Sequence, residues 1–170
     1  MDRPLDSLLD DLELPGHRAV AEHWLELHAR SRAIPALSEL DPLRFPRALA
    51  DIWIVDATED GRFRFRLMGE TLVSWYGRKT KGLHYEDLFP PAMVPDLIEQ
   101  SRAVLERPCI AFQRLQVEAR EPYLPRHIQR LVLPLCDAAG RPAHLLGNST
   151  FNQMQDSDPP PQVRYWYPIP

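Results

Sequence analysis

The stretch from Ile52 to Leu67 reads IWIVDATEDGRFRFRL and decides the fold class. Residues 52–55 are all β-branched or aromatic, and such residues make 52–56 a short run that favours a strand. Asp60-Gly61 then supplies a dipeptide typical of tight hairpin turns. Residues 62–67 alternate strictly between arginine and a large apolar residue. The pattern predicts a β-hairpin whose second strand has one basic face and one apolar face, the latter made of Phe63, Phe65 and Leu67.

Upstream of this hairpin, residues 15–31 predict an amphipathic helix. Pro15 suits a first turn, and Val20, Trp24 and Leu27 recur at helical spacing. This apolar stripe is too large to leave in water. The helix either covers the sheet of its own chain or pairs with the same helix of a second copy. We expect a homodimer through this helix and the exposed sheet face.

Downstream of the hairpin, the sequence predicts helices first and strands afterwards. Short helices are expected at residues 70–76 and 85–89, and a longer helix at 94–106, which Arg107-Pro108 stops. Three consecutive strands follow at residues 109–119, 126–135 and 144–152. The order is therefore two strands, a helical insert and three strands, which is an α+β arrangement.

This order of elements resembles a PAS domain, and the resemblance implies a five-stranded antiparallel sheet with a helical insert after the second strand. It covers residues 45–152, with residues 1–44 as an N-terminal helix and proline-rich connection. Residues 153–170 would form a proline-rich and aromatic tail. More narrowly, the chain is similar to a family of small bacterial single-domain PAS proteins. The residues that carry the likeness are 49–56, 63–70, Tyr76-Gly77, Lys81-Gly82 and Glu86-Asp87.

The resemblance implies sensing or regulation, by a ligand or by contact with a partner. In a PAS-like fold the ligand pocket lies between the inner face of the sheet and the helical insert. An apolar pocket with a few polar groups is the usual form of a small-molecule site. The expected wall residues, which could equally form a filled core, are Trp75, Tyr76, Leu88, Phe89, Phe112, Leu131 and Leu133.

Arg66 is the polar residue expected near this pocket. It could pair with the carboxylate of a ligand, or it could form a structural ion pair with Glu70 or Asp51.

The sequence does not identify a cofactor. Haem needs an axial ligand, and His84, His127 and His144 are scattered. The flavin-binding branch of the family uses a cysteine in the helical insert, but Cys109 and Cys136 lie in predicted strands. Neither cysteine has a companion at zinc-ligand spacing. Haem, flavin and structural metal are therefore not expected, and both thiols are expected to be free.

Bulk composition indicates which partners to expect. The formal net charge is −4, with 20 basic and 24 acidic residues, which argues against nucleic acid and anionic membranes as partners. The acidic, proline-broken N-terminus lacks the basic start and apolar core of a signal peptide. No apolar run approaches the ~18 residues of a membrane span. We expect a cytoplasmic protein.

Three hypotheses about function follow. The first is a sensory module that binds a small molecule in its core and signals through contacts with an unidentified protein. The second is an interaction protein of the same fold without a ligand. The third is a small α+β enzyme, although Ser74 and Ser149-Thr150 lack the glycine-elbow context of a hydrolase and no catalytic residue is assigned. The tail at 156–170 is either extended or docks Tyr165, Trp166 and Tyr167 on its own domain or on a partner.

Overall fold

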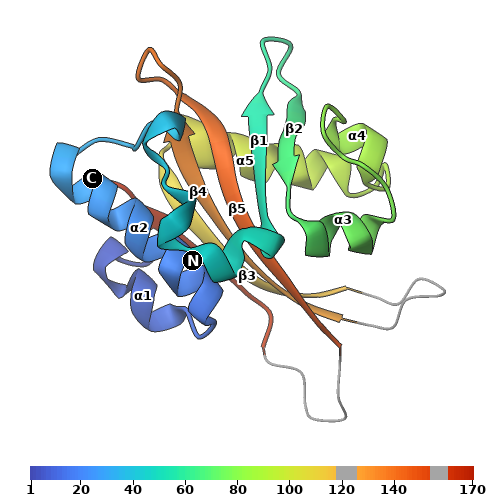
Figure 1. Ribbon diagram of the computed structural model, residues 1–170, viewed down its shortest axis with the longest axis horizontal. Coiled ribbons are helices and arrows are strands. Elements are labelled where there is room, and N and C mark those ends of the chain that lie inside the picture. The colour runs from blue at the N-terminus through green and yellow to red at the C-terminus, as the bar shows by residue number, and fades with distance from the viewer. Residues whose placement is uncertain (118–125, 154–160) are drawn as a thin grey trace.

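A computed structural model of the chain describes residues 1–117, 126–153 and 161–170. Within these ranges one antiparallel sheet has six strands in the order β2-β1-β5-β4-β3-β6 (Figure 1). The α+β class and the helical insert after the second strand are confirmed, whereas the expected number of five strands is one too few. The strands are β1 Ile52–Ala57, β2 Phe63–Met68, β3 Cys109–Val117, β4 Arg126–Cys136, β5 Pro142–Gln153 and β6 Val163–Pro168.

The additional strand, β6, comes from the C-terminal tail. Its residues are mostly β-branched and aromatic, and they pair with β3 from Cys109 opposite Pro168 to Arg114 opposite Val163. The buried Tyr167 donates a hydrogen bond to Asp11 over 2.7 Å. The aromatic part of the tail therefore docks on its own domain. Positions 156–160 of the expected tail lie outside the described residues.

Helices cover both faces of the sheet. The face toward α2 (Pro15–Ser31) is called the outer face, and the face toward α5 (Val94–Glu106) is called the inner face; Figure 1 shows α2 in front of the strands and α5 behind them. No helix in the described part of the chain is long and apolar enough to cross a membrane. The shorter helices are η1 Leu5–Ser7, α1 Leu8–Asp11, η2 Leu37–Glu39, η3 Pro42–Arg44, η4 Pro46–Asp51, α3 Glu70–Tyr76 and α4 Tyr85–Leu88.

The two covered faces give the molecule two hydrophobic cores. The outer core joins Trp24 of α2 to Phe112 and Leu131, among others. The inner core joins Trp53 and Phe65 to residues of the helical insert. Because both faces of the central strands are buried, both alternating sets of side chains are largely apolar, and apolarity alone does not assign a residue to a face.

A β-bulge reverses the face of one predicted core residue. Phe65 lies opposite Val55, but the next matched pair is Leu67 opposite Ile54, so Arg66 is the extra residue. Opposed residues share a face, so Leu67 joins Ile54 on the outer face, where it is 42% exposed. The expectation that Leu67 shares a face with Phe63 and Phe65 is therefore wrong.

Candidate ligand site on the inner face of the sheet

A row of three polar side chains crosses the inner face of the sheet. Gln113 on β3 lies opposite Arg130 on β4, which in turn lies opposite Ser149 on β5. Directly opposed residues of antiparallel strands point to the same face, so these side chains are neighbours. Gln113 and Ser149 are each only 2% exposed. The polar row therefore lies within a core that is otherwise mostly apolar.

Arg130 is the central residue of this polar row. It lines two small cavities that lie in the inner core between the sheet and the helical insert. Its Nε atom is buried and has no hydrogen-bond partner. Among the described residues, no Asp or Glu lines either cavity. Because one N–H of this cation is buried without a partner and no counter-charge lines the cavities among the described residues, the position is suited to an anion.

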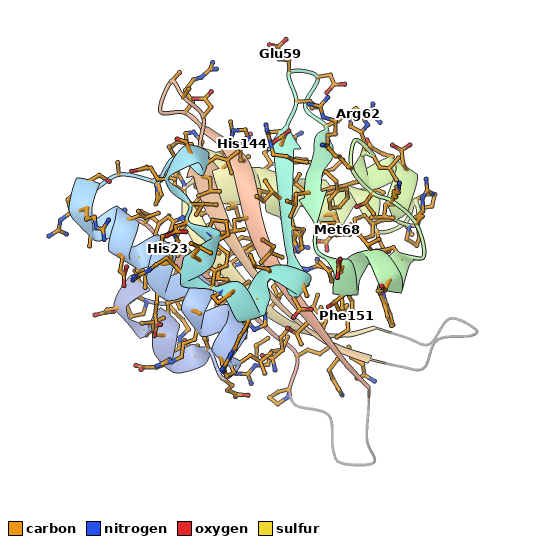
Figure 2. All side chains as sticks on the ribbon, in the orientation of Figure 1. His23, Glu59, Arg62, Met68, His144 and Phe151 are labelled. Carbon is orange, nitrogen blue, oxygen red and sulfur yellow. The ribbon has the colours of Figure 1, made fainter. Side chains whose placement is uncertain are left out.

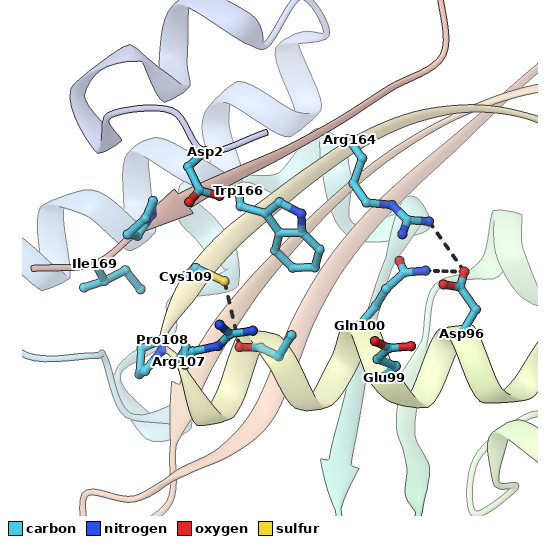
Figure 3. A pocket seen from close by; sticks show the side chains of 12 residues that line it. Asp2, Asp96, Glu99, Gln100, Arg107, Pro108, Cys109, Arg164, Trp166 and Ile169 are labelled. Carbon is cyan, nitrogen blue, oxygen red and sulfur yellow. Dashed lines mark hydrogen bonds and ion pairs between the residues drawn. The ribbon is translucent and has the colours of Figure 1, made fainter.

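The amide of Gln113 is oriented by a chain of hydrogen bonds that starts at the surface. Asp96 accepts a bond from Gln100 Nε2, and Gln100 Oε1 accepts one from Gln113 Nε2 over 2.6 Å. Figure 3 shows Asp96 and Gln100 at the rim of a groove between α5 and β6, where Arg164 also contacts Asp96. An ionised carboxylate only accepts, so both amides have a defined orientation. Gln113 Oε1 is left as a buried acceptor without a partner.

Trp53 closes the site on the side of β1. Its indole Nε1 donates to Ser149 Oγ over 2.9 Å. The ring lies directly over Gly147, where an added Cβ would come within 1.9 Å of the indole. Gly147 is therefore the residue that lets Trp53 lie against the sheet and reach the polar row.

Two tyrosines approach the same cavities from the helical insert. Burial raises the pKa of Tyr85 to about 12, although its hydrogen bond with Ser101 and the charge of Arg130 act in the opposite direction. Burial also raises the pKa of Tyr76. Both phenols are neutral at pH 7, so Arg130 carries the only charge among the described residues that line the cavities.

The two cavities are small, about 30 Å³ each. Pockets for drug-sized ligands have volumes of ~300–1,000 Å³, whereas a cavity needs ~10–15 Å³ to hold one water molecule. The site therefore fits a molecule of only a few non-hydrogen atoms. A flavin or a haem does not fit it, and among the described residues no histidine lines either cavity.

Two of the predicted wall residues line this site, and a third lies beside it. Tyr76 and Phe89 contact one cavity and meet edge to face at 5.9 Å. Trp75 stacks on Phe151 at 4.9 Å, and Phe151 lines the cavity in its place. Leu88 packs against the inner core without lining either cavity.

Phe112, Leu131 and Leu133 point the other way. All three belong to the outer core under α2, and their neighbours Gln113, Arg130 and Val132 face the cavities instead. Their assignment to the pocket wall is wrong, because the more apolar of the two alternating sets faces α2 and the less apolar set faces the cavities.

Arg66 lies away from both cavities. Its Nε is 2.8 Å from Asp56 Oδ1, and its side chain is half exposed. Asp56 also contacts His144 Nδ1 at 2.9 Å, near the end of the sheet that carries the β1–β2 hairpin (Figure 2). Arg66 therefore forms a structural ion pair, and its partner is Asp56 rather than the expected Glu70 or Asp51.

The predicted dimer-interface residues are buried within one chain. Val20 and Trp24 are fully buried and belong to the outer core, Leu27 is also buried, and Trp24 Nε1 donates to the carbonyl of Pro134 over 2.8 Å. Of the two alternatives for the helix at 15–31, the structure shows the first, in which it covers its own sheet. These three side chains are not accessible to a second copy.

The sequence contained a signal for Arg130 and Gln113 that the prediction did not use. Each is a polar residue at an alternating position of a strand whose neighbours on the same face, Ala111 and Val132, are buried. A polar residue within a buried alternating set is the more informative observation.

The cysteines and the potential metal ligands of the described residues form no second site. Cys109 and Cys136 are free and buried, and burial raises the pKa of the Cys109 thiol to about 11. In the described part of the chain no three His, Cys, Asp or Glu side chains are grouped as metal ligands.

A second feature, called the outer groove, lies on the opposite face of the sheet. It is an apolar depression of about 690 Å³ beside β1, β2 and η4. Its lining includes Leu37, Leu40, Leu49, Ile54, Leu67, Met68, Glu70 and Leu146. Leu67 and Leu49 expose a third or more of their surface there, which is typical of an interaction surface.

The fold and site together define a sensory or regulatory module: an antiparallel sheet with a helical insert and a small polar site between them. Residues 13–150 match the model of the family described as PAS domain, and the chain belongs to that family. The matched range includes α2 and ends within β5.

Comparison with curated proteins finds no match. Among solved structures, the chain is similar to the PAS domain of Bordetella pertussis BvgS, with 21% identity, a TM-score of 0.49, and 68% of this chain and 90% of that chain covered. It is also similar to a Colwellia psychrerythraea PAS domain, with 13% identity, a TM-score of 0.46, and coverage of 68% and 100%. The chain is also similar to a Rhodobacter sphaeroides LOV protein, with 17% identity, a TM-score of 0.43, and 69% of this chain and 71% of that chain covered.

Proposed function

We propose that this PAS domain senses a small molecule held on the inner face of its sheet and passes the signal on by protein contact at the outer groove. The observation that carries the proposal is Arg130, whose buried Nε has no partner between two cavities of the inner core. A buried N–H without a hydrogen-bond partner destabilises the folded protein, and a ligand that accepts from Arg130 Nε would remove this cost.

A direct path connects the site to the outer groove. Ser149 accepts the hydrogen bond of Trp53, and the next residue of β1, Ile54, lines the groove. Successive residues of a strand point to opposite faces, so a displacement of Trp53 moves Ile54 as well. A change in the inner core would therefore alter the groove surface without a large rearrangement.

The occupant we propose for the groove is a second copy of the chain. The lining of the groove is almost wholly apolar, and Glu70 is its single charged residue among the described residues. In a two-fold dimer, the same patch meets itself in reverse, so the exposed Leu67 and Leu49 of each copy would be covered by the groove of the other. The homodimer of the sequence prediction is thus retained, with the groove in place of the buried stripe of α2.

A second candidate function is an interaction protein without a ligand. The small size of the cavities, about 30 Å³ each, favours it. An enzymatic function has less support, because the cavities lack a pair of titratable groups suited to acid–base work among the described residues.

Native mass spectrometry of freshly purified protein tests the proposal. The native mass of the wild type should exceed the denatured mass by a small non-covalent ligand, and Arg130→Met should lose that excess. If the native and denatured masses agree for both proteins, ligand sensing is contradicted and the interaction function is favoured instead.

A further inference from the structure

We infer that the ligand is a small monocarboxylate that also carries a hydrogen-bond donor, with its carboxylate at Arg130 and its donor at Gln113 Oε1. This inference rests on the proposed function, because it assigns the chemistry of the same site. It draws on three properties of the site: its charge, its unpartnered acceptor and its size.

The charge of the site favours a single negative charge. Arg130 is the only charged residue among the described residues that line the two cavities, and the remaining lining is aliphatic, aromatic or neutral polar. A dianion would leave one charge uncompensated in this core, which is costly. A carboxylate matches the planar guanidinium through charge-assisted hydrogen bonds.

The second contact is defined by the amide chain from the surface. Asp96 fixes the orientation of Gln100, and Gln100 fixes that of Gln113. Gln113 Oε1 is consequently an acceptor, it is buried, and it has no partner. Gln113 lines one of the two cavities, directly across the strand pair from Arg130. A ligand that bonds to both residues needs a hydroxyl or N–H close to its carboxylate.

The size of the site limits the ligand to a few non-hydrogen atoms. Both cavities are about 30 Å³ and share Trp53, Tyr85, Leu97 and Arg130 in their walls. Glycolate, a two-carbon 2-hydroxycarboxylate, has the required carboxylate and hydroxyl. Acetate lacks the hydroxyl, and acetamide lacks the charge, so the three molecules separate the two contacts.

The test is a titration of ¹⁵N-labelled protein with glycolate, acetate and acetamide, followed at the Nε–Hε signals of the arginines. Arg130→Lys identifies the Arg130 signal by its loss, and Arg64→Lys on β2 is the matched control on the exposed side of the hairpin. We expect glycolate to shift the Arg130 Hε proton downfield to saturation. Acetate should bind about three- to tenfold more weakly, which corresponds to one net hydrogen bond, and acetamide should have no effect.

Gln113→Met tests the second contact. It should reduce the difference between glycolate and acetate to less than about twofold while the Arg130 signal still responds to both. The backbone amide spectrum of each variant reports whether it is folded. A glycolate preference that survives Gln113→Met would overturn the role of Gln113.

Other outcomes separate this inference from the proposed function. If acetamide shifts the Arg130 signal as strongly as acetate, the site binds small molecules but not as a carboxylate site, and only the ligand class is wrong. Only the ligand class is wrong, too, if native mass spectrometry identifies a bound ligand that is neutral. If no probe shifts the signal and the native mass is bare, both the ligand class and the sensing function are contradicted.

Discussion

Gly147 shows how one residue without a side chain shapes the inner core. The Trp53 indole occupies the space where a Cβ would be, and this position allows the indole to donate to Ser149. Gly147 needs no unusual backbone angle here, because it is not among the residues with positive φ. Glycine is needed at this position because the Trp53 ring approaches the backbone closely, and a single sequence does not reveal such an approach.

Gly147→Ala should therefore destabilise the protein by about 1–3 kcal/mol through overpacking. Urea unfolding measures the loss. Gly16→Ala in α2 is the matched control, since a Cβ there meets Ala48 and Asn148 at ordinary distances of 3.6 Å or more, and alanine favours helix by up to ~1 kcal/mol. Equal effects of the two substitutions would contradict the packing of Trp53 on Gly147.

His17 makes stability depend on pH. It is fully buried between α2 and the sheet, with Nε2 3.1 Å from the carbonyl of Asn148. Burial lowers its pKa from 6.5 to about 4, although hydrogen bonds to the backbone of Asn148 and Gln129 act in the opposite direction. Between these two values the unfolded chain binds a proton that the folded chain does not. Stability from this residue is thus complete above pH 6.5 and falls as the pH drops toward 4.

The free energy of unfolding of the wild type should lose up to about 3 kcal/mol from this residue between pH 6.5 and 4. His17→Gln, which keeps a neutral donor, should show a shallower decline over the same range. Parallel pH profiles for the two proteins would mean that His17 is protonated equally in both states.

At the scale of elements, α2 is a structural part of the domain. Its apolar stripe packs on the outer face, and Trp24 also stacks on His28 at 5.2 Å. Trp24→Ala should cost about 3–5 kcal/mol of unfolding free energy, whereas Leu43→Ala, at an 82% exposed position, should stay within ~0.5 kcal/mol. The difference should not change with protein concentration; a loss seen only at high dilution would instead indicate that Trp24 contacts a second copy.

The sequence predicted the elements better than it predicted their faces. The helices at 15–31, 70–76 and 94–106 match α2, α3 and α5 in full, because helical periodicity and the flanking prolines or glycines are local signals. The positions of Leu67 and Phe112 depend on a bulge and on a second covered face, which are properties of the assembled sheet. Tyr76 and Phe89 line the cavity from the helical insert, whose position the order of elements predicts. The place of Arg130 depends on which face of β4 is turned to the cavities, and the sequence alone did not predict that face.

β6 was missed because its partner strand is distant in the sequence. Residues 163–168 follow a proline-rich segment, and β3 lies about fifty residues upstream. Aromatic content indicated that the tail docks somewhere, but the choice of β3 over another edge required the order of the whole sheet.

At the scale of the whole molecule, the oligomeric state tests whether the outer groove is the signalling surface. The wild type should be a dimer by light scattering at micromolar concentration. Leu67→Asp should make it monomeric, because the charge would be buried in the apolar groove. Leu43→Asp, outside the groove, should remain a dimer. A monomeric wild type, or a dimeric Leu67→Asp, would exclude this groove as the interface.

The central claim, that binding on the inner face alters the outer groove, is tested most directly by backbone amide spectra of ¹⁵N-labelled protein with and without glycolate. We predict saturable shifts at Gln113 and Ser149 on the inner face, together with shifts of the same midpoint at Ile54 and Leu67 in the groove. Shifts confined to the inner face, or no shifts at all, would contradict the claim.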